Sequence, residues 1–122
     1  MVEVICDTSF LIHLATTRIK NISTIETEIG SLQFLIPDVV ENELQNLSKD
    51  EKKKQNVLAT LEFSKTLKKI PITGKFADKE LINYVKQHGG IIGTMDKNLK
   101  EMVKKSGGSI ISFSNDRIVL ES

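Results

Sequence analysis

Short apolar runs alternate with helical patterns along the whole chain, and this alternation limits the fold more than any other feature. Continuous apolar runs occur at 2–6, 33–37, 91–94 and 109–113. Such runs are typical of strands that are buried on both faces, as in a parallel sheet covered by helices. We therefore predict an α/β fold, a three-layer sandwich in which helices cover both faces of a central, mainly parallel sheet.

The segments between the apolar runs predict helices and two weaker strands. One helical pattern begins at 10, and others cover 16–33, 38–47, 49–69, 76–90 and 97–108, of which the last two are closed by glycine. In 49–69 we expect Val57, Leu58, Leu61 and Leu67 on the inner face. Weaker patterns predict an edge strand at 70–73 and a final strand at 117–121. A chain of 122 residues fits one domain, because a chain of this size can support a single core.

Composition and charge leave the class of partner open. Seventeen Lys and Arg residues against sixteen Asp and Glu residues give a net charge of +1, which neither demands nor excludes a polyanionic partner. The single cysteine, Cys6, excludes an intrachain disulfide and suits a reducing compartment. The first residues include Glu3 and Asp7 and have no basic lead, unlike a signal peptide or a membrane span. We expect a cytoplasmic protein that does not contact a membrane.

Two aspartates stand at the ends of predicted strands. Asp7 directly follows the run at 2–6, and Asp96 follows the run at 91–94 with Met95 between them. Open α/β sheets bind ligands outside the carboxyl ends of their strands, so both carboxylates would face a binding crevice. Each aspartate also suits a helix N-cap, where it accepts backbone N–H groups. The two roles are compatible, and the residues alone leave both open.

Other acidic residues separate by their place in the helical patterns. Asp38 and Glu41 have the spacing of a capping box, which explains both without a function. Glu43 shares a helix face with Val40, and a charge beside a buried stripe needs a partner or a metal. Asp78 lies at the N-terminal end of the apolar face of the helix predicted at 76–90.

Four carboxylates therefore form the candidate catalytic site: Asp7, Glu43, Asp78 and Asp96. Carboxylates gathered at one edge of a sheet raise one another's pKa values unless cations neutralise them. A site made only of oxygen ligands suits Mg²⁺ or Mn²⁺ better than Zn²⁺. Such a site favours hydrolytic phosphoryl chemistry.

Four motifs, in this order and spacing, resemble the acidic motifs of the PIN-domain nucleases: ICDTSFLI, VVENEL, FADKELINYVKQHGG and IIGTMDKNL. Residues 76–105 and the segment ISFSNDR are especially similar to the PIN endonuclease of the eukaryotic small-subunit ribosome processome and its archaeal relatives. The resemblance implies a PIN-like fold and an endoribonuclease, a hydrolase that depends on Mg²⁺ or Mn²⁺. It implies structured RNA as the substrate, such as precursor ribosomal RNA.

The resemblance also assigns roles to individual residues. It implies that the four carboxylates bind the metal and that Ser9 and Thr94 are small polar residues that assist the aspartates. Two positions depart from the family pattern: Asn98 and Lys79 stand where relatives commonly carry a second acidic residue. Both departures reduce the negative charge near the site, which bears on the binding of a second metal.

Contacts with RNA are predicted from the positions of the lysines. Lys97 and Lys100 lie beside the last motif and are candidate phosphate contacts. The lysines of 49–54 alternate with acids, and we expect them on a solvated helix face. Five Phe and one Tyr are too few for extensive base stacking. His13 and His88 have sequence surroundings that suit structural roles.

Two other functions remain open. The first is a PIN-like scaffold with negligible turnover that binds RNA or ribosome-assembly factors. The second is the toxin endoribonuclease of a toxin–antitoxin pair, silenced by an antitoxin-like inhibitor. A receiver-like domain is disfavoured because we cannot place its phosphoacceptor and late-strand lysine. Apolar residues around 19–35 raise the hypothesis of a homodimer.

Overall fold

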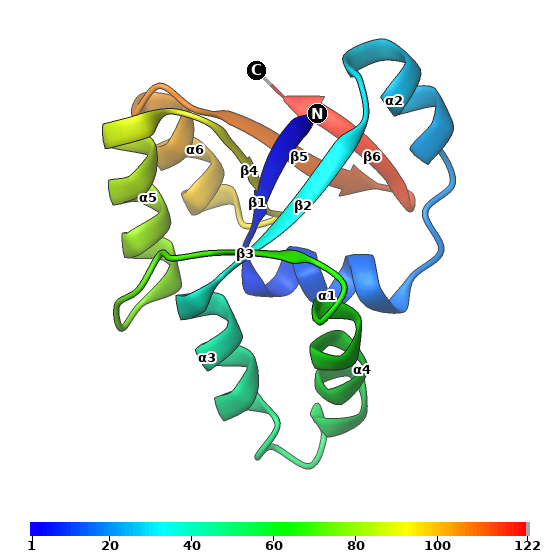
Figure 1. Ribbon diagram of the computed structural model, residues 1–122, viewed down its shortest axis with the longest axis vertical. Coiled ribbons are helices and arrows are strands. Elements are labelled where there is room, and N and C mark those ends of the chain that lie inside the picture. The colour runs from blue at the N-terminus through cyan, green and yellow to red at the C-terminus, as the bar shows by residue number, and fades with distance from the viewer. Residues whose placement is uncertain (122) are drawn as a thin grey trace.

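A six-stranded sheet forms the centre of the molecule (Figure 1). The computed structural model describes residues 1–121. The strands are β1 (Val2–Cys6), β2 (Leu32–Pro37), β3 (Lys68–Ile70), β4 (Ile91–Gly93), β5 (Ser109–Ser114) and β6 (Arg117–Glu121). Their order across the sheet is β3-β2-β1-β4-β5-β6, and all neighbours are parallel except the antiparallel pair β5 and β6. The predicted mainly parallel sheet is confirmed.

Six helices flank this sheet among the described residues: α1 (Thr8–Thr16), α2 (Ile22–Ile29), α3 (Asp38–Leu47), α4 (Lys54–Ser64), α5 (Ala77–His88) and α6 (Lys97–Lys105). Helices α1, α3 and α4 pack on one another, and α5 packs on α6. Figure 1 shows these two groups at different places around the sheet, with α2 apart from both. The predicted α/β sandwich is confirmed. No helix within residues 1–121 is long and apolar enough to span a membrane.

The apolar runs are buried on both faces in their central parts, and those of β1, β2 and β4 also at their carboxyl ends, whereas the first residues of β1 and β2 are exposed or partly buried. Val4, Ile92 and Ile110 lie in neighbouring strands and are inaccessible to solvent. Cys6 is also fully buried, and burial raises the pKa of its thiol well above the ordinary value. A buried thiol of this kind is unreactive, so Cys6 is a core residue.

A glycine allows α1 to pack directly on β4. A Cβ atom at Gly93 would lie 2.8 Å from the ring of Phe10, which is closer than real side chains approach. The Phe10 ring also stacks on Phe113 of β5, with a centroid distance of 4.5 Å. The first turn of α1 is therefore held against the carboxyl end of β4.

The helix predicted at 16–33 is shorter in the structure. α2 covers only Ile22–Ile29, and the preceding Asn21 joins the loop to β6. Its side-chain amide donates to the Ile118 carbonyl oxygen at 2.9 Å, and its oxygen accepts from the Ile118 N–H at 2.7 Å. Ile19 and Ile25 pack on the core of the same chain. The large apolar residues of 19–35 are not exposed, so the homodimer hypothesis loses the surface on which it was based.

The helix predicted at 49–69 and the strand predicted at 70–73 both differ from the structure. Residues 49–53 form turns, and Leu58, predicted on the inner face, is 47% exposed. The buried face of α4 carries Val57 and Thr60 instead. The edge strand lies earlier, at Lys68–Ile70, because the following proline lacks the N–H that a strand ladder requires.

The capping box predicted for α3 is wrong. Asp38 is the first residue of the helix, and its side chain forms no cap hydrogen bond. Glu41 instead forms an ion pair with Lys69 beside β3, with an N–O distance of 3.2 Å. The proline at 37 already fixes the chain at the entry to the helix, so the cap is not needed.

Candidate active site

The candidate site lies where the strand order changes direction. β1 pairs with β2 on one side and with β4 on the other, so the connections after β1 and β4 leave a crevice between them. The Asp7 N–H donates to the Gly93 carbonyl oxygen at 2.9 Å, and the Thr94 N–H donates to Ile111 at 3.0 Å. These bonds continue the sheet pairing beyond the strand ends and place Asp7 and Thr94 next to each other.

Asp7 is a helix cap and a buried charge at the same time. It is 5% exposed, and its Oδ1 accepts from the Phe10 N–H at 2.8 Å and from the Ser9 hydroxyl at 3.3 Å. Its Oδ2 accepts from the Thr94 hydroxyl. Burial raises the pKa of Asp7 to about 6, although these three hydrogen bonds lower it, and the charge of Asp78 raises it further. The carboxylate is therefore held in place but its charge is not fully compensated.

Asp96 caps α6 in the same way that Asp7 caps α1. Its Oδ1 accepts from the Leu99 N–H at 3.0 Å, and its own N–H donates to the Thr94 hydroxyl oxygen at 3.1 Å. Thr94 is fully buried, so its hydroxyl connects the two aspartate turns. Both capping roles that the sequence left open are present in the structure.

Asp78 links the two aspartates electrostatically from the first turn of α5. Desolvation raises its pKa above the ordinary value, and the charge of Asp96 raises it further. The charge of Asp78 in turn raises the pKa of Asp7. Asp78 is thus close enough for its charge to interact with that of Asp7 and with that of Asp96, although the three residues come from segments far apart in the sequence.

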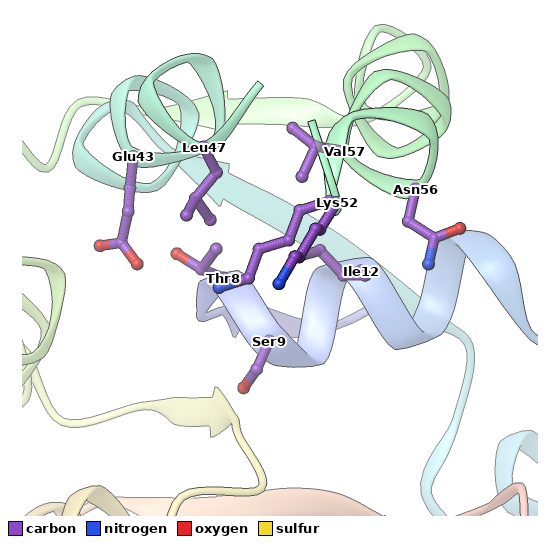
Figure 2. Close-up of a pocket in the computed structure, with 9 residues that line it drawn as sticks. Thr8, Ser9, Ile12, Glu43, Leu47, Lys52, Asn56 and Val57 are labelled. Atoms are coloured by element: carbon purple, nitrogen blue, oxygen red, sulfur yellow. The ribbon is translucent and has the colours of Figure 1, made fainter. Parts of the chain in front are cut away.

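Glu43 reaches the same region from the opposite side, on α3. It is half-buried, whereas Val40 and Leu44 on the same helix are fully buried, as the helical spacing predicted. Its carboxylate lines a cavity together with Thr8 and Ser9 of α1 (Figure 2). Glu43 therefore lies beside the residues that directly follow Asp7.

The arrangement of the carboxylates fits an open metal site better than a closed one. Within residues 1–121, no group of three or more His, Cys, Asp or Glu side chains converges closely enough to enclose a metal ion. The expected gathering of all four carboxylates is therefore not present in these side-chain positions. Mg²⁺ is commonly held by one or two carboxylates and several waters. The oxygen-only donors fit that kind of site.

The predicted RNA contacts differ in their availability. Lys97 is exposed at the first position of α6, beside Asp96. Lys100 forms an ion pair with Glu121 at 2.8 Å, which would have to open for Lys100 to contact a phosphate. The pKa of Glu121 is lowered to about 2, chiefly by Lys100 and then by the Ser112 hydroxyl. Lys97 is thus the better placed of the two predicted lysines.

The two positions that depart from the family pattern are both exposed. Lys79 follows Asp78 in the first turn of α5, and Asn98 is the second residue of α6. Neither side chain takes part in the hydrogen bonds that hold Asp7 and Asp96.

Two lysines were missed by sequence reasoning. Lys52 and Lys53 are exposed, as predicted, but they lie in turns and not on a helix, and they also line the cavity beside Glu43. They lie in the turns before α4. No local sequence pattern predicts that these turns fold back toward α1. His13 and His88 do have the structural surroundings that were expected, because their rings pack on Phe113 and Tyr84.

Comparison with known proteins agrees with this geometry. Residues 4–115 match the family model described as PIN like domain. The chain belongs to the PIN-like domain family. The motif resemblance to the PIN-domain nucleases is confirmed.

Two relatives of this PIN-domain chain carry functional names. It is 30% identical over 112 residues to Ribonuclease VapC4 from Methanocaldococcus jannaschii, covering 87% of this chain and 86% of that protein. The solved structure of the PIN domain endonuclease Utp24 superimposes with a TM-score of 0.79 and 29% identity, covering 98% of this chain and 90% of that one. Both matches span nearly the whole PIN-like domain.

Proposed function

We propose that this PIN-domain chain is a metal-dependent endoribonuclease that hydrolyses phosphodiester bonds in RNA. The observation that carries the proposal is the placement of Asp7 and Asp96 around the Thr94 hydroxyl at the change of strand order, with Asp78 near enough to raise the pKa of Asp7. The names of the two relatives, a ribonuclease and an endonuclease, support the same class of reaction.

The metal would be Mg²⁺ or Mn²⁺, held by carboxylates of the set Asp7, Glu43, Asp78 and Asp96 together with water. When bound, the cation lowers the pKa of a water molecule and polarises the phosphate. The chain itself fixes the position of each aspartate. The Phe10 N–H and the Thr94 hydroxyl hold both oxygens of Asp7, and the Leu99 N–H holds Asp96.

Structured RNA, such as precursor ribosomal RNA, is the proposed substrate in the cytoplasm, with ribosome-assembly factors as partners. The motif similarity in 76–105 supports this choice, since that segment forms α5, β4 and α6 around two of the aspartates. Lys97 is available for phosphate contacts beside Asp96. A toxin inhibited by an antitoxin-like partner would share this chemistry and differ only in its RNA target.

A binding scaffold is the second candidate, and one observation favours it. The carboxylates do not converge into a closed cluster within residues 1–121, and Lys79 lies beside Asp78 where relatives carry an acid. A scaffold would keep the fold and the RNA contacts with negligible turnover.

The decisive experiment is cleavage of a labelled, structured RNA with Mn²⁺, Mg²⁺ or EDTA. Wild type, Asp7→Asn and Glu28→Gln are compared, because Glu28 is an exposed acid on α2 and its change removes the same charge away from the site. We expect metal-dependent cutting by wild type and Glu28→Gln, and none by Asp7→Asn. Absence of cutting by folded wild type on several RNAs would leave the scaffold as the better proposal.

A further inference from the structure

A cavity between α1, α3 and α4 begins at the residue after Asp7. It has a volume of about 470 Å³, within the range of about 300–1,000 Å³ that is usual for small-molecule sites. Glu43 and Ser9 line it, so it opens directly beside the candidate active site (Figure 2). Its contents would therefore be adjacent to the phosphate that is cut.

A buried hydroxyl in this cavity has no partner. Thr8 is 8% exposed, and its Oγ1 is buried without a hydrogen bond within the described part of the chain. Figure 2 shows this hydroxyl on the side of the cavity where the Glu43 carboxylate lies. Native proteins rarely leave a buried polar atom unpaired, so the Thr8 hydroxyl would gain a partner from a ligand that displaces the side chains covering it.

The charges that line the cavity are separated. Lys52 and Lys53 line one part of it, and neither forms an ion pair within residues 1–121. Figure 2 shows Lys52 extending across the cavity toward α1, with Glu43 on the other side. An anion would therefore bind on the lysine side, because Glu43 repels it from the other.

The remaining lining residues are apolar with one amide. Ile12, Leu47 and Val57 provide the apolar surface, and Asn56 adds a side chain that both donates and accepts hydrogen bonds. A ligand that matches this lining has an anionic group, a flat apolar surface and polar edges. A ribonucleotide has all three.

We infer that this cavity binds one unpaired nucleotide of the RNA, next to the scissile phosphate, an inference that rests on the proposed function. Lys52 and Lys53 contact its phosphate, and the base packs on Ile12 and Leu47. The hydroxyl of Thr8 and the amide of Asn56 hydrogen-bond to its polar edges. A base inside a duplex cannot enter the cavity, so the site selects single-stranded RNA at the point of cleavage.

The test measures binding of a short, labelled, unstructured RNA by fluorescence anisotropy over a range of salt concentrations. Lys52→Ala/Lys53→Ala is compared with Lys86→Ala/Lys105→Ala, which removes two exposed lysines from the last turns of α5 and α6. Wild type is measured in EDTA, and Asp7→Asn is measured in Mg²⁺, so that cleavage does not interfere. Thermal unfolding verifies that each variant is folded.

We expect the first double variant to raise Kd about tenfold and to lower the slope of log Kd against log salt by about 1, while the control double variant changes neither. Ile12→Trp, which fills the cavity without changing charge, should raise Kd to a similar extent with an unchanged slope. Thr8→Val should reduce discrimination among the four homopolymeric RNAs.

Two outcomes separate this inference from the proposed function. If wild type cuts RNA but the cavity variants bind it as the control does, the inference is wrong and the nuclease proposal stands. If wild type never cuts but its RNA binding is lost in the cavity variants, the inference stands and the nuclease proposal fails. Equal binding of duplex and single strand would also overturn the inference.

Discussion

Replacing Asp7 by Asn should make the metal-free protein more stable while removing its activity. Asp7 is buried, and its pKa is raised from 3.8 to about 6, so the folded state disfavours the charged carboxylate at neutral pH. This rise corresponds to about 3 kcal/mol, at 1.36 kcal/mol for each pKa unit. Asn keeps the shape and the oxygen that accepts from Phe10, its amide nitrogen can donate to the Thr94 hydroxyl in place of the bond that Asp7 accepts, and it carries no charge. We expect Asp7→Asn to raise the free energy of unfolding by up to about 3 kcal/mol at pH 7.5.

The pH dependence gives the sign of this effect. Between pH 3.8 and about 6 the folded state binds a proton at Asp7 that the unfolded state has released. Wild type therefore loses stability as the pH rises through this interval, and above it the loss is complete. The advantage of Asp7→Asn should be largest at pH 7.5 and should shrink toward zero near pH 4.

Urea unfolding in EDTA, at several pH values from 4 to 7.5, measures both proteins under matched conditions. Added Mg²⁺ or Mn²⁺ should stabilise wild type by about 2.7 kcal/mol at one hundred times its Kd, and Asp7→Asn by less. The reasoning is refuted if Asp7→Asn is less stable than wild type at pH 7.5 in EDTA, or if the difference between them does not change with pH.

Three further substitutions test the surroundings of the site. Thr94→Val removes the hydroxyl that donates to Asp7, so it should lower the free energy of unfolding by about 1–3 kcal/mol and abolish cleavage. Thr94→Ser keeps a hydroxyl and should retain both stability and cleavage. Loss of cleavage in both variants would contradict a role for the hydroxyl. Gly93→Ala should destabilise by about 1–3 kcal/mol in urea unfolding, because the new Cβ meets the Phe10 ring, and wild-type stability would show that the ring moves freely. Glu43→Gln should lower the rate of RNA cleavage with little change in thermal unfolding, since this side chain is half-buried; unchanged kinetics at limiting metal would remove Glu43 from the site.

The central part of the fold could be predicted because it depends on local patterns. Runs such as 91–94 contain no charged residue and place apolar side chains at adjacent positions, Ile91 and Ile92, which is typical of a strand buried on both faces. Parallel strands end at the same edge of a sheet. The positions of Asp7 directly after its strand and of Asp96 shortly after its own were therefore enough to place the two aspartates at one edge. The structure adds the hydroxyl of Thr94 between the two aspartates. This hydroxyl donates to Asp7, which is 87 positions away in the sequence, so local patterns could not predict the bond.

Other parts depended on tertiary contacts that the sequence does not display. Hydrogen bonds between Asn21 and Ile118 hold the loop before α2. The helix predicted at 16–33 therefore begins only after this loop. The inner face of α4 carries Thr60, a polar residue whose hydroxyl bonds to the Asn56 carbonyl oxygen within the helix, so a search for apolar residues chose Leu58 instead. Lys52 lines the cavity only because the turns before α4 return the chain to α1.

The pairing of β1 with β4 delays the appearance of the site during synthesis. Asp7 comes early in this domain, but the strand that completes its surroundings ends at Gly93, and the aspartate that caps α6 comes later still. Contacts between distant parts of a chain form slowly, and a growing chain folds only as its segments emerge. A nascent chain therefore carries Asp7 without Thr94 or Asp96 until about three-quarters of the domain has been translated. Chains that stop before that point should hold none of the paired carboxylate geometry, and on the proposed function they should not cleave RNA.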